Sequence, residues 1–590
     1  MRLQAFCLCW LPLCALAAGA PVDPASELRR AIAAVCANPG ADAAPSVTRI
    51  APGGRLRELH AVYEAPAGSG KRPELLVVAG PDCAVRYWRR LEYSSDGRAL
   101  ALWFLHADLS PSGAGELLDA PVPAAPDPGG VAVAHVDSGV NYLLPGIASR
   151  LARDPDGAAL GYDWWDMDRQ PFDQDPSRSA FFPQRHGTRT ASLLLEEAPH
   201  ARLIPYRYPR PDMSRMTQVV AAAKAGARIV VLSMGSNRRA EWDAYAQAAS
   251  RHPEMLFIVS AGNDGRDLDR EPVYPAALKL ANQLSVSSAE DDGSLARGSN
   301  WGARSVDLLV PAERVLVTGF DGRRIFASGS SYAGARVGAL AACLLAAHPQ
   351  WQAKELREAI LARAQAPRGQ GWSAHGFLPD PVARDRGACP AAQVAVSERW
   401  SESFSGADVA PGAAPAKALD LSVVAVADSG WEPPDVRALL RSAAAIFGQC
   451  GIALREVSVH YVSAPERLHY FTLETAQALV RARAHAKPAV YLVADTRRPV
   501  PFDAEAFAPA NSAAHPQLAD TVWIMRGMRH PGIALAHELV HVLTNSGEHS
   551  SQPGNLMREE TALENTQLTA EQCRQILEGG TARGLLAEPK

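Results

Sequence analysis

Four polar residues have types and local settings that could together cleave an acyl bond: Asp137 in VAHVDSGV, His186 in QRHGTRT, Asn263 in FIVSAGNDG and Ser331 in ASGSSYAGARV. A serine is a weak nucleophile at neutral pH, so it needs an imidazole to take its proton and a carboxylate to orient that imidazole. An amide such as that of Asn263 can donate to the oxyanion that develops on the substrate. We therefore expect Asp137 to orient His186, His186 to act as base and then acid, and Ser331 to attack.

A second group of residues, in IALAHELVHVLTNSGEHSSQPGNLM, could hold a metal ion. His537 and His541 are four apart, so on a helix they share one face and could bind one Zn²⁺, while Glu538 beside them could take a proton from water. His549 is the next histidine along the chain, and Met557 follows it. We expect His537, His541 and His549 to be the zinc ligands. The alternative third ligand is one of three downstream carboxylates: Glu559, Glu560 or Glu564.

The segments around the first group predict how it is positioned. VAVAHVD is typical of a buried strand that ends at Asp137, and MLFIVS is typical of a strand that ends just before Asn263. Side chains that act chemically gather at the carboxyl ends of strands in an open parallel sheet. His186 precedes a helical pattern, and Ser331 begins a helix of small residues whose N-terminal dipole faces the nucleophile. These features predict a doubly wound α/β fold with a parallel sheet.

These four segments resemble the subtilase family of serine proteases, over residues 126–385. IVVLSMG (229–235) resembles the strand that pairs with extended substrate, and SNWG (299–302) is a further landmark in the right order. The resemblance implies endopeptidase activity on protein or peptide substrates. The order Asp, His, Ser argues against an α/β-hydrolase esterase, in which the serine comes first. Two positions depart from the family pattern: Ser330 replaces the usual Thr, and Ala335 replaces the usual Pro.

The second group falls in a separate region that begins after a change in composition. Residues 386–417, which include much of SESFSGADVAPGAAPAKA, are predicted to be a linker. Residues 418–590 then alternate strand and helix patterns and resemble the metzincin zinc metalloproteases, in which a Met-turn follows the third histidine. Thr544 stands where the family has Gly, and His549 comes two residues later than the family's third ligand. We therefore expect the segment NSGE to bulge and an α+β fold to surround the site.

The rest of the chain indicates export and one further domain. The chain has 590 residues and a formal net charge of −4, and it lacks a basic stripe with aromatic residues, so a nucleic-acid partner is not expected. Residues 1–20 have the architecture of a signal peptide, which predicts a secreted or periplasmic protein with no stable membrane insertion after its removal. Residues 21–125 are expected to form a small α+β or β-rich domain, either a pro-region or an accessory domain.

Six cysteines lie beyond the predicted signal peptide, and they permit disulfides in an exported chain. Cys36–Cys83 and Cys450–Cys573 are the favoured pairs because each falls within one region. Cys343 is expected to be a buried free thiol, the common state of a single helical cysteine. An acidic segment with Asp166, Asp168, Asp173 and Asp175 could bind Ca²⁺, although a solvated acidic loop is the favoured interpretation.

The sequence as a whole predicts an exported bifunctional endopeptidase with a serine site and a separate zinc site. One alternative is an active subtilase with a catalytically idle C-terminal domain that binds metal or protein. A second is a non-enzymatic binding protein built from two inactive protease folds, which the intact set of reactive residues disfavours. A third keeps the serine chemistry but uses it for ester hydrolysis or peptide ligation, because a fold alone does not fix the reaction.

Overall fold

The structure is a computed structural model that describes residues 23–38, 47–68, 70–113, 115–366, 369, 371–381, 394–404, 415–496 and 504–589. The predicted signal peptide and Cys389 lie outside the described residues. The chain divides into two compact units, one holding residues 1–123 and 166–186 and the other holding residues 124–165 and 187–590. Each unit is described by itself.

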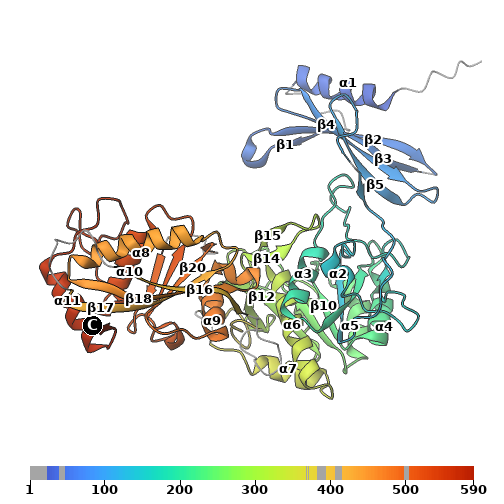
Figure 1. The fold of residues 1–590 in the computed structure, drawn as a ribbon. Coiled ribbons are helices and arrows are strands. Elements are labelled where there is room, and N and C mark those ends of the chain that lie inside the picture. Colours follow the sequence, from blue (N-terminus) through green and yellow to red (C-terminus); the bar gives the residue numbers. More distant parts are fainter. Residues whose placement is uncertain are drawn as a thin grey trace, which may run out of the picture. The chain divides into compact units, whose positions relative to one another are not determined.

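The first unit contains helix α1 (Pro24–Ala37) and a sheet of six antiparallel strands in sequence order, drawn in blue in Figure 1. The buried face of α1 presents Leu28, Ile32 and Val35 to the core that surrounds Trp88. A disulfide joins Cys36 and Cys83, as the sequence predicted. The small α+β arrangement agrees with the sequence prediction for this region. Its strands are β1 (Val47–Ile50), β2 (Glu58–Ala67), β3 (Gly70–Ala79), β4 (Val85–Tyr93), β5 (Ala99–His106) and β6 (Glu116–Leu117).

The second unit begins with a sheet of seven strands in the order β13-β12-β11-β10-β7-β9-β8, and every pair is parallel. These strands are short and almost wholly buried, as expected of a parallel sheet that is covered on both faces. Their bounds are β7 Val131–Asp137, β8 Tyr162–Asp163, β9 Ala201–Arg207, β10 Ile229–Leu232, β11 Leu256–Ser260, β12 Gln283–Ala289 and β13 Leu308–Pro311. The strands β14 (Val315–Thr318) and β15 (Arg324–Ala327) form a separate antiparallel pair.

Helices cover both faces of this sheet, which confirms the doubly wound prediction. The helices α4 (Met216–Gly226) and α5 (Asp243–Ser250) pack on the face that carries Val230, Leu232 and Val259. The helix α6 (Ser330–Ala347) lies on the other face, where a Cβ on Gly338 would come within 2.5 Å of Val231. Among the described helices α6 alone is long and apolar enough for a membrane span, and 89% of it is buried inside the protein. The remaining helices of this region are α2 (Pro145–Ala148), α3 (Gly187–Glu197) and α7 (Ala353–Leu361).

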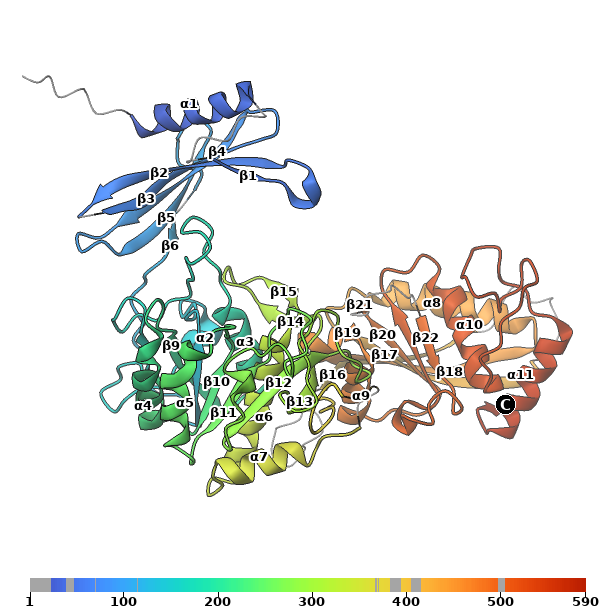
Figure 2. The same ribbon diagram turned by 180° about the vertical axis from the view of Figure 1, so that it is seen from behind.

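The C-terminal part of the second unit is built on another sheet, in the order β16-β18-β17-β20-β23-β22 with β24 beside β17 (Figure 2). The four central strands β18, β17, β20 and β23 run parallel, whereas β16 and β22 are antiparallel to their neighbours. The larger strands are β16 (Ala395–Phe404), β17 (Lys417–Val426), β18 (Ile452–Ser463), β20 (Ala489–Val493), β22 (Ala504–Phe507) and β23 (Thr521–Met525). The two-residue strands are β19 (Tyr470–Phe471), β21 (Asp495–Thr496) and β24 (Leu586–Ala587).

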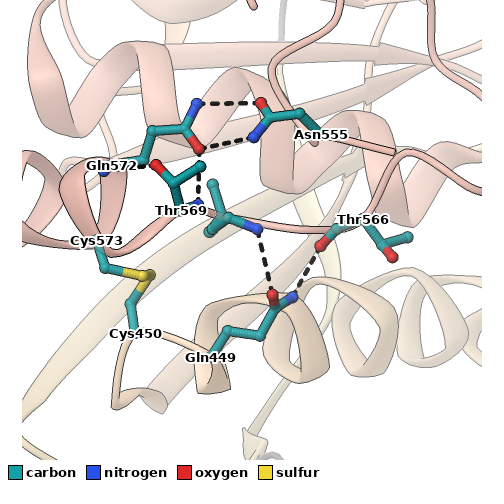
Figure 3. The surroundings of a disulfide bond; sticks show 8 residues. Gln449, Cys450, Asn555, Thr566, Thr569, Gln572 and Cys573 are labelled. Carbon is teal, nitrogen blue, oxygen red and sulfur yellow. Dashed lines mark hydrogen bonds between the residues drawn. A yellow bond between two sulfur atoms is a disulfide. The ribbon is translucent and has the colours of Figure 1, made fainter. Parts of the chain in front are cut away.

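Helices again lie on both faces of the C-terminal sheet. One core contains apolar residues of α8 (Pro433–Gly448), α10 (Pro531–Thr544) and α11 (Ala570–Ala582). The core on the opposite face contains residues of α9 (Leu473–Ala482). Figure 3 shows how the disulfide Cys450–Cys573 joins the end of α8 to α11, with Gln449 bonded to the chain beside it. This pairing agrees with the sequence prediction.

Two sequence expectations differ from the structure here. Residues 395–404, within the expected linker 386–417, form the edge strand β16, whose outward residues are polar, as is common where an edge faces water. Cys343 was expected to be a free thiol, but it is disulfide-bonded. Its position on the apolar helix α6 concealed this, since the local pattern resembles that of an ordinary buried cysteine.

Candidate active sites

Asp137 is the last residue of β7 and is almost completely buried, with 2% of its surface exposed. The backbone N–H of Ser138 donates to its Oδ1 at 2.7 Å. The hydroxyl of Thr190 donates to its Oδ2 at 3.1 Å. The carboxylate is therefore held in one orientation at the carboxyl end of the sheet. Ser138 and Thr190 are supporting residues that sequence reasoning missed, although Thr190 lies in the same helical pattern as His186.

His186 ends the first unit and is bonded directly to Gly187, which begins α3 in the second. The N–H of Gly187 donates to Ser138 Oγ at 2.9 Å. A Cβ on Gly187 would come within 2.0 Å of the carbonyl oxygen of Gly139 and 3.1 Å of the Asp137 Cβ. Only glycine allows this approach, so the glycine after the histidine brings the chain directly beside the aspartate.

Ser331 is the second residue of α6 and is buried, with 8% of its surface exposed. The backbone N–H of the preceding Ser330 donates to Asn263 Oδ1 at 2.9 Å, and Ser330 Oγ accepts from the N–H of Gly262 at 3.0 Å. Because Asn263 Oδ1 accepts this bond, its Nδ2 is the end of the amide left to donate to a ligand beside Ser331. The structure therefore brings Asn263 and Ser331 together. The hydroxyl of Ser330 makes a hydrogen bond that the hydroxyl of the usual Thr could also make.

Two further residues, Gly329 and Asn300, position the segments that carry Ser331 and Asn263, and sequence reasoning missed both. Gly329, at the N-cap of α6, has φ 130°, and a Cβ there would come within 3.0 Å of Asn263 Oδ1. Asn300 is fully buried, and its Oδ1 accepts from the N–H groups of Asp264 and Arg266 while its Nδ2 donates to Ala261. Asn300 thus fixes the loop that carries Asn263. The motif SNWG, which contains it, was the signal that could have identified this role.

The segment IVVLSMG only partly fits the role that its resemblance implied. Its first four residues form β10, which is paired on both edges, with β7 and with β11. A strand whose two edges are occupied has no backbone groups left for a substrate. Substrate pairing through this segment is therefore restricted to residues after Leu232.

The three histidines of the second group lie together, with their candidate ligand atoms within 4.8 Å of one another. The Nε2 atoms of His537 and His541 are 3.0 Å apart. The ring of His549 is centred 5.3 Å from that of His537 and 4.9 Å from that of His541. Among the residues that the structure describes, no other set of three such side chains meets this criterion.

The hydrogen bonds of His537 and His541 fit a divalent metal ion. Each Nδ1 faces a backbone carbonyl, of Leu556 at 2.8 Å and of Ser546 at 2.7 Å, so each Nδ1 carries the proton. Both Nε2 atoms then present lone pairs to one another, an arrangement that a shared cation would stabilise. Carbonyl partners of this kind orient histidines that bind metals. Burial lowers the pKa of His537 to about 4 and also lowers that of His541, which keeps both rings neutral.

The chain after α10 accommodates the two-residue departure from the family spacing. Asn545 ends α10 in the left-handed region at φ 53°, and the next residue, Ser546, accepts the bond from His541. The segment then returns His549 to the other two histidines. Met557 is buried in the core below, and its carbonyl accepts from the N–H of Ser550 at 2.6 Å. The alternative ligands Glu559, Glu560 and Glu564 are exposed and are not part of the histidine group.

Glu538 lies next to His537 on α10, close to the edge strand β22. Burial, together with the negative charge of Glu505, raises the pKa of Glu538 to about 8, and a hydrogen bond from the N–H of Ala506 opposes this shift. A carboxyl of this kind can exchange protons near neutral pH. Sequence reasoning missed Glu505 and Ala506 because the four-residue strand β22 is too short to give a periodic signal, and its place beside Glu538 depends on the fold.

The acidic segment does not form the solvated loop that was favoured. Asp173 is fully buried, and Asp175 is 9% exposed. Asp168 pairs with Arg98 at 2.7 Å, whereas Asp166 is exposed. The carboxylates of Asp168 and Asp175 also accept from the backbone N–H groups of Gln170 and Ser177, both at 2.8 Å. No group of three metal-ligating side chains is found in this segment among the described residues.

Comparison with known proteins found a family match for the region that contains the serine group. Residues 129–377 match the family model of the subtilases. This part of the chain, which includes the parallel sheet described above, is therefore similar to a subtilase domain. The match begins just before β7 and ends near Phe377, so it contains all four residues of the serine group.

The curated relatives match the same region. A thermophilic serine proteinase of Bacillus sp. strain AK1 is 26% identical over 257 residues, 41% of this chain and 58% of the relative. Halolysin of Haloferax mediterranei is 29% identical over 235 residues, 37% of this chain and 42% of the relative. The chain thus spans about half the length of these two relatives. Among solved structures, a cold-adapted subtilisin-like serine proteinase covers 45% of this chain and 93% of its own, at 23% identity and a TM-score of 0.36.

Proposed function

We propose that this protein is an exported endopeptidase with two catalytic sites, a subtilase-type serine site and a zinc site. Both hydrolyse peptide bonds in protein or peptide substrates. The subtilase domain supports the first site, and the histidine group of the C-terminal domain supports the second. The two sites use unrelated chemistry, so their activities are separable by inhibitors.

At the serine site, Asp137 holds the imidazole of His186 in one tautomer, and His186 takes the proton of Ser331 as its Oγ attacks the carbonyl carbon. The Nδ2 of Asn263 donates to the oxyanion, and the N-terminal dipole of α6 also favours the negative charge. His186 then gives the proton to the leaving amine. Water releases the acyl group by the same steps in reverse.

At the second site, His537, His541 and His549 would hold the zinc ion. The bound ion supplies Lewis acidity at the scissile carbonyl. Glu538 accepts a proton from the attacking water and passes it to the leaving nitrogen. Met557 and the chain around it would lie beneath the three histidines, as the metzincin resemblance implies.

The single observation that carries the second site is the shared tautomer of His537 and His541. Both rings donate through Nδ1 to backbone carbonyls and turn bare Nε2 atoms toward each other and toward His549. A group of histidines that only filled a core would have no reason to place these atoms together. The mixed sheet and the buried Met557 support the metzincin resemblance further.

Digestion of casein by the purified mature protein tests both sites at once. A serine-directed phosphonate should remove part of the activity, a chelator should remove another part, and the two together should remove all of it. Loss of all activity to the phosphonate alone would favour the alternative in which the C-terminal domain is catalytically idle. Hydrolysis of esters without hydrolysis of casein would contradict the endopeptidase proposal for the serine site.

Residues 21–125 are proposed to be a pro-region that the serine site removes. Its compact fold and its own disulfide would allow it to fold before it is cleaved. Intact mass should show that the wild-type protein loses residues 21–125, whereas the Ser331→Ala variant keeps them. Retention in both forms would make this unit an accessory domain.

A further inference from the structure

A buried arginine connects the two helices that carry the serine chemistry. Arg336 lies five residues after Ser331 on α6, about 7.5 Å along the helix axis. It is 3% exposed, and its Nε donates to Glu197 at 2.8 Å. Glu197 is the last residue of α3, the helix that begins directly after His186. This ion pair therefore fixes the helix of the nucleophile against the helix that follows the base.

The C-terminal domain supplies a further carboxylate partner for the guanidinium of Arg336. Glu474, in the first turn of α9, accepts from both terminal nitrogens of the guanidinium and is 9% exposed. Asp380 accepts from Nη2 at 3.3 Å and is approached by Arg481 of α9 at 3.5 Å. Burial and the neighbouring charge of Glu474 raise the pKa of Asp380. A charge buried to this degree is costly unless it keeps its partners, and Arg336 takes one of these partners, Glu474, from outside the subtilase domain.

Partly exposed contacts surround this buried group. Arg324 of β15 donates to Glu196 at 2.8 Å and to Glu466 of the C-terminal domain at 2.9 Å. The ring of Phe326 meets that of Tyr470 edge to face, with centroids 5.0 Å apart. These contacts form a partly exposed rim around the buried charged group. Figures 1 and 2 both show α9 between the C-terminal sheet and the subtilase domain.

We propose that α9 of the C-terminal domain is a docking element for the serine site, in which Glu474 neutralises Arg336 and thereby holds α6 against α3. Arg336 and Glu474 are positioning residues, because neither touches the reacting atoms. The subtilase domain reaches its active geometry only when the C-terminal domain is docked on it. This role does not need the zinc site, and it persists when that site is inactivated.

Two readouts on the full-length protein test this docking. The first is hydrogen exchange of the backbone amides of α3 and α6. Glu474→Leu removes the carboxylate that binds both terminal nitrogens of Arg336 and leaves Glu197 and Asp380 in place, so we expect exchange in both helices to become at least tenfold faster. The second is the rate at which a fluorophosphonate labels Ser331, which rests on the proposed serine activity and should fall at least tenfold. With a peptide substrate, kcat should fall while KM changes little, because the substrate contacts are not altered.

Glu466→Leu is the matched control. Glu466 of the C-terminal domain also pairs with an arginine of the subtilase domain, Arg324, but it is exposed at the rim. This variant should leave both readouts within about twofold of wild type, as is common for exposed ion pairs. If Glu474→Leu does not fold, Glu474→Gln replaces it, with the same direction expected. Wild-type exchange and labelling in both Glu474 variants would overturn the docking proposal. Failure of the wild-type protein to label would overturn the serine activity instead, while the exchange measurement would still decide the docking.

Discussion

The two candidate sites are assembled in different ways. The serine group collects Asp137, Asn263 and Ser331 from separate segments at the carboxyl ends of strands and at one helix N-terminus, with His186 just before α3. The histidine group takes two members from one turn of α10 and the third from the loop that follows. The first site can therefore form only when a whole sheet is complete. The second depends mainly on helical spacing and on the path of one short loop.

This difference in assembly also determines how well each site tolerates insertions in the chain. In the serine site, small residues such as Gly187 and Gly329 allow backbone segments from distant parts of the chain to approach closely. In the histidine site, backbone carbonyls orient the rings, and Ser546 of the loop after α10 is one of the partners. A site built from distant segments tolerates few insertions, whereas a site at the end of one helix can accommodate them in its loop.

The largest effect should follow from Ser331→Ala. Removal of the nucleophile in a subtilisin-type triad lowers kcat by about 10⁶-fold. We expect fluorophosphonate labelling to disappear and casein hydrolysis that resists chelators to fall to background. Mass spectrometry of the labelled protein checks the position. Undiminished labelling of the variant would contradict the assignment of Ser331.

The second prediction concerns Asn263→Ala. Loss of one oxyanion donor typically lowers kcat by about 10²–10³-fold. Because Asn263 Oδ1 also accepts from the N–H of Ser330, some loss of order at the start of α6 is expected as well. Labelling should continue, while peptide hydrolysis slows. Steady-state kinetics check this, and an unchanged kcat would remove Asn263 from the site.

The third prediction tests the insertion at the histidine site. His549→Ala should weaken zinc binding by more than about 100-fold, since even residues behind the ligands are worth 10- to 100-fold. The matched variants Glu559→Ala, Glu560→Ala and Glu564→Ala should bind zinc normally, because these side chains are exposed and lie outside the group. Competition with a chromogenic chelator measures the affinities. A normal affinity for His549→Ala with loss in one glutamate variant would replace the metzincin interpretation by a thermolysin-like one.

The smallest effect on catalysis should come from the Cys450–Cys573 disulfide. It closes a loop with a sequence separation of 123 residues, and neither cysteine is one of the reactive side chains. Replacement of both cysteines by alanine should lower the free energy of unfolding by about 2–5 kcal/mol. Denaturant unfolding checks this, with both activities near wild type in native buffer. The Cys36→Ala, Cys83→Ala double variant is the control, because it should leave unfolding of the C-terminal domain unchanged.

Sequence reasoning predicted residues whose roles follow from local patterns and missed those whose roles depend on the fold. The strand before Asp137, the helix after His186 and the shared face of His537 and His541 all follow from periodicity. Asn300 could not be assigned, because its amide bridges backbone groups that only the folded loop brings together. Arg336 was equally invisible, since its partners lie on α3 and on a helix of another domain.

The errors have related causes. The solvated loop was wrong for Asp173 and Asp175, because composition does not reveal which carboxylates are drawn inward. The strand β16 falls in a stretch rich in small and polar residues, whose pairing with β18 depends on a partner some sixty positions along the chain. The disulfide state of Cys343 depends likewise on a distant residue.

The most direct test of the central claim is casein hydrolysis by four forms of the full-length protein: wild type, Ser331→Ala, Glu538→Ala and the double variant. Each single variant should keep part of the activity, and the residual activity should be removed by the chelator in the first and by the phosphonate in the second. The double variant should be inactive. Equal activity of Glu538→Ala and wild type, together with complete inactivity of Ser331→Ala, would contradict the claim that this chain carries two working catalytic sites.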